Sequence, residues 1–498
     1  MSIPRTGRRT AAALGLAATT AAAGLALPYG ATAATAAPAT YVVLYKKGAS
    51  TGDARSVVSD AGGTLVANHS AIGVVIARSA DSSFADVVER HGRVQGAAST
   101  GNFAVHPDLD DSAQGPMPGS APAAHKDTLS GLQWDMRQIN TPQAHAITGG
   151  SGQVVVGDVD TGLDFTHPDL ADNYSAAHSA DCSSGTPQPL AVGNDKNGHG
   201  THTAGTIAAA SDGSGIVGVA PNVTIAGIKS SNDDGFFFPE MVICSYMWVA
   251  EHGIDVTNNS YFADPWLFNC KNDAEQRVIW NAERRAIRHA QSNGTVVVAS
   301  EGNSSTDLSH PERDVISPDF PPGSEQERDI TNACAVVPVE VPGVVGVTAT
   351  GDESLKSFYS SYGISTADVA APGGDSILQQ TAEAPNGRVL SSWPQENACS
   401  RAVHDPATGA KYCYLQGTSM AGPHVAGVAA LVLSQRGSKS SGSVAAALQQ
   451  ATNPLPCPDE SIYADFPQSN GEPQHCQGGM APNSFYGSGE IDAFKAVR

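Results

Sequence analysis

The sequence predicts a doubly wound α/β domain with a mostly parallel sheet, preceded by a small α+β unit. Beyond residue 130, short runs rich in Val and Ile alternate with stretches long enough to form crossover helices. Ahead of them, residues 41–105 carry a tighter pattern of strands and helices. A chain of 498 residues has room for one large domain and for smaller segments in front of it.

The N-terminus predicts a secretory signal peptide over residues 1–34. Arg8 and Arg9 precede an apolar stretch at 11–27, and an Ala-x-Ala cleavage site follows at 31–33. Because the stretch is built from small residues and Thr, it makes a poor membrane anchor, and no later segment is apolar enough to span a bilayer. Because Arg8 and Arg9 are adjacent, export by the twin-arginine route stays open as an alternative to the general secretory route. We therefore expect a secreted, extracellular protein.

The composition argues against two classes of partner. The formal net charge is -21, whereas binding to nucleic acid depends on clustered Lys and Arg that neutralise phosphates. We therefore expect neither nucleic acid nor an anionic membrane surface as a partner, and we expect a monomer. Hydrophobic residues make up 41% and charged residues 15% of the chain, which is typical of a globular protein with a large core.

Cysteines behind a signal peptide indicate disulfides, because the chain would mature in an oxidising compartment. No Cys-x-x-Cys occurs, which disfavours a zinc site. We favour Cys399 with Cys413 and Cys457 with Cys476, since each pair closes a short, turn-rich loop. The pairing of the other four stays open. The eight cysteines are Cys182, Cys244, Cys270, Cys334, Cys399, Cys413, Cys457 and Cys476.

The segment 41–105 predicts a β-α-β-β-α-β unit of the ferredoxin-like type. Its expected elements are a strand at 41–45, a helix at 53–61, a strand pair at 64–78, a helix at 82–91 and a final strand. Residues 106–129 follow as a linker dense in Pro, Ser, Ala, Gly and Asp, without a hydrophobic period. Such a linker is exposed and easily cut.

The large domain is expected over residues 130–498, where continuous β-branched runs are typical of buried parallel strands. Alternation of such strands with helices indicates a doubly wound sheet. In these sheets reactive groups gather at the carboxyl ends of the strands. The expected strands are 154–159, 223–228, 254–257, 296–299 and 344–348.

Asp160 ends the first of these strands, in Val-Gly-Asp-Val-Asp-Thr-Gly at 156–162. A carboxylate at this position can orient a histidine. An aspartic-protease interpretation of Asp-Thr-Gly would need a second carboxylate sharing the proton, and the sequence has no second Asp-Thr-Gly or Asp-Ser-Gly.

His199 and Ser419 stand in two further motifs. His199 lies in Asn-Gly-His-Gly-Thr-His at 197–202, a Gly-flanked turn without the i, i+4 histidine pair and Glu of a zinc protease. Ser419, in Gly-Thr-Ser-Met-Ala-Gly-Pro, opens an apolar-faced helix whose first turn is expected to tolerate Pro423. A lipase-type nucleophile elbow would need Gly where position 421 is Ala.

These three motifs, in the order Asp, His, Ser, resemble the subtilisin-like serine proteases (subtilases). The resemblance spans residues 130–498 and includes Val-Ala-Ala-Pro-Gly and Gly-Ser-Gly-Glu-Ile-Asp-Ala near the C-terminus. It implies a serine endopeptidase that needs no cofactor for catalysis, in which Ser419 attacks polypeptide substrates, His199 transfers the proton and Asp160 orients His199. A non-catalytic binding protein on the same fold is the alternative, which would be expected to lack a triad residue.

The same resemblance implies that segment 41–105 is an inhibitory propeptide and that the chain is a self-processed zymogen. It assigns Asn303, in Ser-Glu-Gly-Asn, as the oxyanion donor. It also places Ser260, Tyr261 and Phe262 in the substrate-binding strand.

Phe262 stands where relatives usually have Gly, so the ring either narrows the specificity pocket or turns outward against Trp266 or Phe268. Asp169 and Asp212 match the positions of calcium ligands in some subtilases, which makes a structural calcium site a hypothesis.

Overall fold

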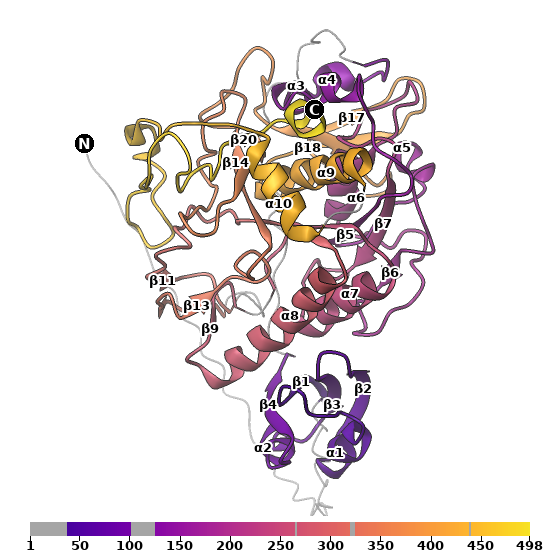
Figure 1. Cartoon of the computed structure of the whole chain (residues 1–498), viewed down its shortest axis with the longest axis vertical. Coiled ribbons are helices and arrows are strands. Elements are labelled where there is room, and N and C mark those ends of the chain that lie inside the picture. Colours follow the sequence, from indigo (N-terminus) through magenta and orange to yellow (C-terminus); the bar gives the residue numbers. More distant parts are fainter. Residues whose placement is uncertain (1–36, 101–124, 264–265, 319–323, 438–439) are drawn as a thin grey trace, which may run out of the picture. The chain divides into compact units, whose positions relative to one another are not determined.

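The computed structural model describes most of the chain beyond its N-terminal segment (Figure 1). The expected signal peptide, and most of the expected linker, lie outside the described residues. The described residues are 37–100, 125–263, 266–318, 324–437 and 440–498.

The N-terminal α+β unit is a four-stranded antiparallel sheet in the order β2-β3-β1-β4, with two helices. Alternate residues of its central strand face opposite sides, as a strand requires. Tyr41, Val43 and Tyr45 pack on the two helices, while Val42 and Leu44 face away from them. The expected ferredoxin-like pattern is therefore confirmed. Its elements are β1 (Ala39–Tyr45), α1 (Ala54–Asp60), β2 (Thr64–His69), β3 (Val74–Ser79), α2 (Phe84–Glu89) and β4 (Val94–Ser99).

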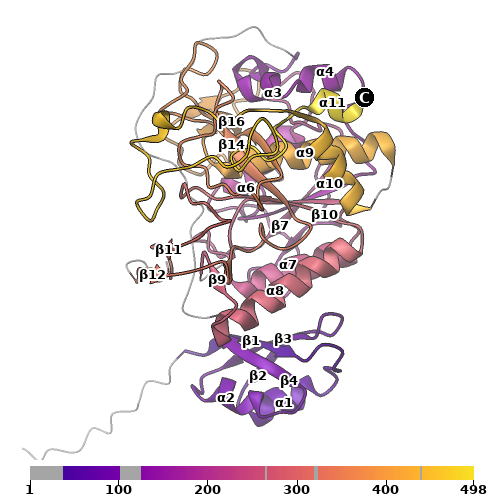
Figure 2. The same ribbon diagram turned by 60° about the vertical axis from the view of Figure 1, so that its left-hand side comes forward.

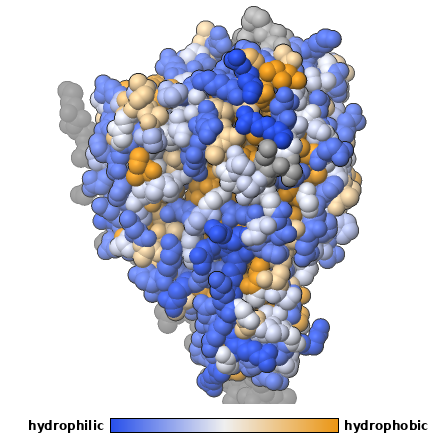
Figure 3. Space-filling view, viewed as in Figure 1, coloured by the Kyte–Doolittle hydropathy of each residue, from blue (hydrophilic) through white to orange (hydrophobic). Residues whose placement is uncertain are grey.

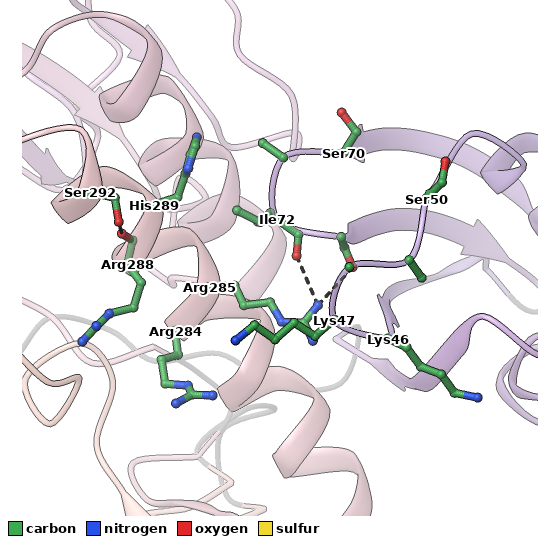
Figure 4. Close-up of a pocket in the computed structure, with 14 residues that line it drawn as sticks. Lys46, Lys47, Ser50, Ser70, Ile72, Arg284, Arg285, Arg288, His289 and Ser292 are labelled. Carbon is green, nitrogen blue, oxygen red and sulfur yellow. Dashed lines mark hydrogen bonds between the residues drawn. The ribbon is translucent and has the colours of Figure 1, made fainter.

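The outward face of β1 and β4 is buried on helix α8 (Ala274–Ser292). Arg285 of α8 donates from Nη1 to the carbonyl oxygens of Tyr45 (2.9 Å) and Ile72 (3.1 Å). Its Nη2 donates to Gln95 Oε1 at 3.1 Å. Figure 4 shows Arg285 beside Ile72 in a cavity of about 820 Å³ whose lining also includes Lys47.

The large domain is built on a nine-stranded sheet in the order β19-β20-β15-β14-β10-β8-β5-β7-β6. All neighbouring strands are parallel except the edge pair β19 and β20. From β5 the chain first adds β7 on one side and then β8 on the other, so the topological switch point lies at β5. The strands are β5 (Val155–Asp160), β6 (Ala180–Asp181), β7 (Thr224–Lys229), β8 (Val256–Asn259), β10 (Val296–Ser300), β14 (Val345–Thr350), β15 (Val369–Pro372), β19 (Thr452–Asn453) and β20 (Glu490–Ile491).

Helices cover both faces of this sheet, as Figure 2 shows. Helices α7 (Pro239–Glu251) and α8 pack on one face, where Val155 and Val159 of β5 contribute to the core. Val156 points to the other face, which is covered by α6 (His199–Ala208), α9 (Thr418–Arg436) and α10 (Ser441–Gln450). The doubly wound, mostly parallel sheet predicted from the sequence is confirmed.

Four disulfides tie the loops of the large domain. Both expected pairs are present, Cys399 with Cys413 and Cys457 with Cys476. The pairs that the sequence left open are Cys182 with Cys244 and Cys270 with Cys334. The remaining elements are η1 (Ser130–Leu132), α3 (Trp134–Gln138), α4 (Thr141–His145), α5 (Pro168–Ala171), β9 (Asn269–Cys270), β11 (Arg313–Asp314), β12 (Arg328–Asp329), β13 (Cys334–Ala335), β16 (Val389–Ser392), β17 (Ala402–His404), β18 (Lys411–Leu415), η2 (Glu460–Tyr463) and α11 (Ala493–Val497).

Hydrophilic side chains cover much of the face shown in Figure 3, with apolar residues scattered among them. Large exposed apolar side chains such as Val192, Ile377 and Met480 come from separate loops. In the described part of the chain, no helix combines the length and the apolar character needed to cross a bilayer.

Candidate active site

Asp160 and His199 form a buried pair at the switch point of the sheet. Asp160 is the last residue of β5, and His199 is the first residue of α6. His199 Nδ1 lies 2.7 Å from Asp160 Oδ1, and both side chains are almost fully buried. The same carboxylate oxygen accepts the Thr161 N–H at 2.7 Å. The carboxylate therefore fixes the orientation of the imidazole ring.

The turn before α6 requires glycine. Gly198 has a φ of 99°, and a Cβ on it would lie 2.6 Å from the Trp393 ring. A side chain at this position would collide with Trp393 and strain the backbone directly before His199, so the Gly of the motif has a direct steric reason.

Ser419 is the second residue of α9 and is joined to Ser260, which follows β8. Ser419 Oγ donates to the Ser260 carbonyl oxygen at 3.2 Å, and Ser260 Oγ donates to the Ser419 carbonyl oxygen at 3.0 Å. This reciprocal pair holds the start of α9 against the end of β8.

Pro423 is not in the first turn of α9, contrary to the expectation from sequence. The helix begins at Thr418, so Pro423 lies inside it. Because Pro has no N–H, it cannot donate to the carbonyl four residues earlier, which is that of Ser419. The Ser260 hydroxyl donates to the Ser419 carbonyl oxygen in its place. This carbonyl group therefore has a hydrogen-bond partner although the helix supplies none.

Asn303 lies in the loop after β10, beside the start of α9. Its Oδ1 accepts both the backbone N–H and the hydroxyl of Thr418, each at 2.9 Å. With the carbonyl end of the amide held this way, its Nδ2 faces Gly417. A Cβ built on Gly417 would lie 3.5 Å from Asn303 Nδ2, 3.6 Å from the Ser419 backbone nitrogen and 3.7 Å from Asn303 Oδ1. The Asn303 amide and the Ser419 nitrogen thus both adjoin the space that the absence of a side chain at Gly417 keeps open.

Tyr261 and Phe262 both turn toward the core. The Tyr261 ring stacks on Phe237 with ring centroids 4.2 Å apart, and its hydroxyl donates to Asn259 Oδ1 at 3.3 Å. Phe262 is half-buried and packs against the apolar cluster that contains Phe268. Both alternatives for the Phe262 ring stay predictions. The Tyr261 side chain is buried and is placed for packing.

The two acids expected to bind calcium are engaged with backbone N–H groups. Asp169 is fully buried and accepts the Ile216 N–H at 3.0 Å. Burial, followed by the negative charges of Asp212 and Asp127, raises the pKa of its carboxyl group to about 7. Asp212 accepts the Ser214 N–H at 2.9 Å, and Asp127 accepts the N–H groups of Asp212 and Gly213. The calcium site stays a hypothesis. Among the described residues, no three acidic, His or Cys side chains are grouped to hold a metal.

Sequence reasoning missed two polar residues that support this site. Thr418 donates two hydrogen bonds to Asn303. The only feature of the sequence that could have indicated this role is its position directly before Ser419. Asp158 lies two residues before Asp160 on the same face of β5 and is fully buried. The available signal was an acidic residue within an otherwise apolar strand.

Comparison with known proteins places the chain among proteases. It is 31% identical over 318 residues to "Fervidolysin" of Fervidobacterium pennivorans, which covers 61% of this chain and 38% of that protein. It is 29% identical over 372 residues to "Thermitase" of Thermoactinomyces vulgaris, covering 74% and 97%. The chain thus spans much less than the whole of the first relative and nearly all of the second.

Solved structures share the fold. The structure of fervidolysin, described as a keratinolytic enzyme related to subtilisin, aligns with a TM-score of 0.62 and 23% identity, over 93% of this chain and 61% of that one. The epidermin leader peptide processing serine protease of Staphylococcus aureus aligns with a TM-score of 0.65 and 22% identity, over 92% and 98%. Residues 151–489 match the model of the subtilase family. Since that match covers well over half of the chain, the chain belongs to the subtilase family.

Proposed function

We propose that the protein is a secreted serine endopeptidase that cleaves peptide bonds through an acyl-enzyme. Asp160, His199 and Ser419 are its catalytic triad, and Asn303 is its oxyanion donor. The observation that carries this proposal is the buried Asp160–His199 pair, 2.7 Å apart, at the carboxyl end of β5. Ser419 lies in the first turn of α9, and the Asn303 amide adjoins the start of that helix. Membership of the subtilase family and the named protease relatives support it.

In the proposed first step, Ser419 Oγ attacks the carbonyl carbon of the scissile peptide bond and His199 Nε2 takes the hydroxyl proton. Asp160 Oδ1 keeps Nδ1–H in place and stabilises the imidazolium that forms. The carbonyl oxygen becomes an oxyanion between Asn303 Nδ2 and the Ser419 N–H. When the C–N bond breaks, His199 gives its proton to the departing amine. Water then attacks the ester, with His199 as the base, and Ser419 recovers its proton.

The expected substrate is an extended polypeptide that pairs with the backbone of residues 260–262, in the manner of an added strand. The burial of the Tyr261 and Phe262 side chains supports backbone recognition there, because the side chains are engaged with the core. No cofactor is required for the chemistry described.

We further propose that the α+β unit is an inhibitory propeptide and that the linker at 106–129 is cut by the enzyme itself. The contact with α8 supports this assignment, because it buries the outward face of β1 and β4 and adds four hydrogen bonds from Arg285. Four disulfides agree with an oxidising, extracellular compartment. We expect the mature enzyme to act as a monomer.

The test is hydrolysis of casein by the purified wild type and by Ser419→Ala. Loss of the nucleophile is expected to lower kcat by about 10⁶-fold, the size of loss that removal of the serine causes in subtilisin. The variant should also accumulate the uncut precursor. Hydrolysis by the variant at a rate near that of the wild type would contradict the assignment. A folded wild type without any activity would favour the non-catalytic binding protein.

A further inference from the structure

Asp158 is a second carboxyl group on the strand that ends with Asp160. Residues two apart on a strand share a face, so Asp158 and Asp160 both point toward α6 and α9, the side on which Val156 packs. Asp158 has no exposed surface. An acidic side chain is rarely buried in this way unless its oxygens are bonded.

Both oxygens of Asp158 have partners, each on a different element. Thr203 Oγ1 of α6 lies 2.7 Å from Asp158 Oδ2, and Asn258 Nδ2 of β8 donates to Oδ1 at 2.9 Å. Thr203 and Asn258 are themselves fully buried. The carboxyl group therefore joins β5, β8 and α6 beneath the proposed active site.

The two partners lead directly to the proposed catalytic residues. Thr203 Oγ1 also lies 3.3 Å from the His199 carbonyl oxygen and 3.0 Å from that of Gly200, in the first turn of α6. Asn258 Nδ2 donates to Ser260 Oγ at 3.1 Å, and Ser260 Oγ donates to the Ser419 carbonyl oxygen. One connected set of hydrogen bonds thus links the first turn of α6, which begins with His199, through Asp158 to Ser419.

The hydrogen bonds are compatible with a proton on Asp158. Thr203 has one hydroxyl proton and three oxygen neighbours, namely Asp158 Oδ2 and the two carbonyl groups. If Asp158 is protonated, Oδ2–H donates to Thr203 Oγ1, and the Thr203 proton serves the Gly200 carbonyl. Oδ1 stays an acceptor for Asn258, so every group in the set is satisfied.

The charges around Asp158 act in the same direction. Burial raises the pKa of Asp158 well above its usual range, and the negative charges of Asp160 and, to a smaller extent, Asp195 raise it further. The hydrogen bonds with Asn258 and Thr203 lower the pKa of Asp158, but by less than burial raises it. Helix α6 adds His199, which faces Asp160. Lys229 of β7 directs its ammonium group to Thr161 O, Asn194 O and Asp233. Strand β8 offers only the neutral Asn258, and His424 of α9 is bonded to Asp135.

We propose that Asp158 is a positioning residue that, as a neutral carboxylic acid, holds the first turn of α6 and the end of β8 in place around Asp160. In this arrangement Asp160 is the one ionised carboxylate of β5 that faces His199. Asp158 touches neither substrate nor the reacting atoms. The inference rests on the proposed triad but concerns a residue that the triad mechanism does not use.

The first experiment compares Asp158→Asn with Asp158→Val by steady-state kinetics on a peptide substrate. Asn keeps one acceptor and one N–H donor in a neutral group, so kcat is expected to stay within about threefold of the wild type. Val removes both hydrogen bonds, and the resulting misplacement is expected to lower kcat by about tenfold to a hundredfold, with little change in KM. Glu283→Val, which removes another buried acid on the α7/α8 face, is the control and should leave kcat unchanged.

Two kinetic outcomes would overturn the proposal. If Asp158→Val retains the kcat of the wild type, Asp158 does not position the site. If Asp158→Asn lowers kcat as much as Asp158→Val does, the site needs a charged carboxylate, and the proposal that Asp158 is a neutral acid is wrong.

The second experiment measures stability, so it does not depend on activity and holds even where Asp158→Val fails to fold. Two variants of the full chain are unfolded between pH 5 and 8. The parent carries Ser419→Ala alone, and the second variant carries Ser419→Ala together with Asp158→Asn. A folded-state pKa above the unfolded one means that folding retains a proton, so the stability of the parent falls as pH rises through this window.

Asn at 158 cannot ionise, so the ratio of the two unfolding constants should grow by up to about tenfold per pH unit in favour of Asp158→Asn. If this ratio does not change with pH, the proposal that Asp158 is protonated in the folded protein is wrong. Failure of the proposed function itself is a separate result, because it would appear as activity in Ser419→Ala.

Discussion

At the scale of the residue, the proposed oxyanion site depends on how Asn303 is held. Thr418 fixes the carbonyl end of the Asn303 amide with two hydrogen bonds, so the amide N–H₂ is directed before any substrate arrives. Donors oriented in advance stabilise a developing oxyanion without reorganisation. Thr418 therefore contributes to the site although it touches no substrate.

Replacing Asn303 by Ala is expected to lower kcat by about 10² to 10³-fold with KM nearly unchanged, the effect of losing this donor in subtilisin. Thr418→Val keeps the backbone donor but loses the hydroxyl, and a smaller loss, about tenfold, is expected. Steady-state kinetics on one peptide substrate measures both. Equal kcat for Asn303→Ala and the wild type would show that the amide does not face the reacting carbonyl.

The Ser260 hydroxyl has a structural task that follows from Pro423. Ser260→Ala leaves the buried Ser419 carbonyl without a donor, which is expected to cost about 1 to 3 kcal/mol of stability. Adding Pro423→Ala supplies the missing backbone N–H and should recover much of that loss. Thermal unfolding of the two variants in the Ser419→Ala chain tests this coupling. If the two effects simply add, the Ser260 hydroxyl does not stand in for the helix bond.

At the scale of the element, the strands were predictable because buried parallel strands are continuous apolar runs. The run at 154–159 corresponds to β5 and the run at 296–299 to β10, each within one residue. The observed strands end on the polar residues Asp160, Asn259 and Ser300, and this end of the sheet carries the proposed chemistry.

Some features depended on contacts that spacing cannot reveal. The partners of Asp158 lie on β8 and α6, far along the chain, so its burial in a bonded set could not be inferred from the strand alone. The predicted position of Pro423 depended on where α9 begins, and the prediction was wrong by about a turn because the helix begins at Thr418. The sequence also could not show that Asp127 binds the N–H groups of Asp212 and Gly213, in the loop that carries one of the two expected calcium ligands.

At the scale of the whole molecule, latency is expected to depend on the contact between the α+β unit and α8. Arg285 is the polar centre of this contact, because it donates to three backbone carbonyl groups and to Gln95. Removing it leaves those carbonyl groups with one donor fewer. Arg284, its neighbour on α8, bonds instead to Asn281 of the same helix and offers a matched control.

Arg285→Ala is expected to weaken inhibition by the α+β unit, because hydrogen bonds from a charged group contribute about 1.5 to 3 kcal/mol. The inhibition constant of the unit should rise by about tenfold to a hundredfold, and the precursor should become active earlier. Arg284→Ala should behave as the wild type. Activity assays during maturation, with the three chains at equal concentration, provide the measurement. Equal latency of Arg285→Ala and Arg284→Ala would show that Arg285 does not hold the unit.

The central claim is that Ser419 is a nucleophile activated by His199, and labelling with a fluorophosphonate tests it most directly. Peptide mass spectrometry of the labelled wild type should find one adduct, on Ser419, with labelling and casein hydrolysis lost in parallel. Labelling should become much slower in His199→Ala, because no base then removes the proton of the Ser419 hydroxyl as it attacks. An adduct on another residue, or equally fast labelling of Ser419 in His199→Ala, would contradict the account.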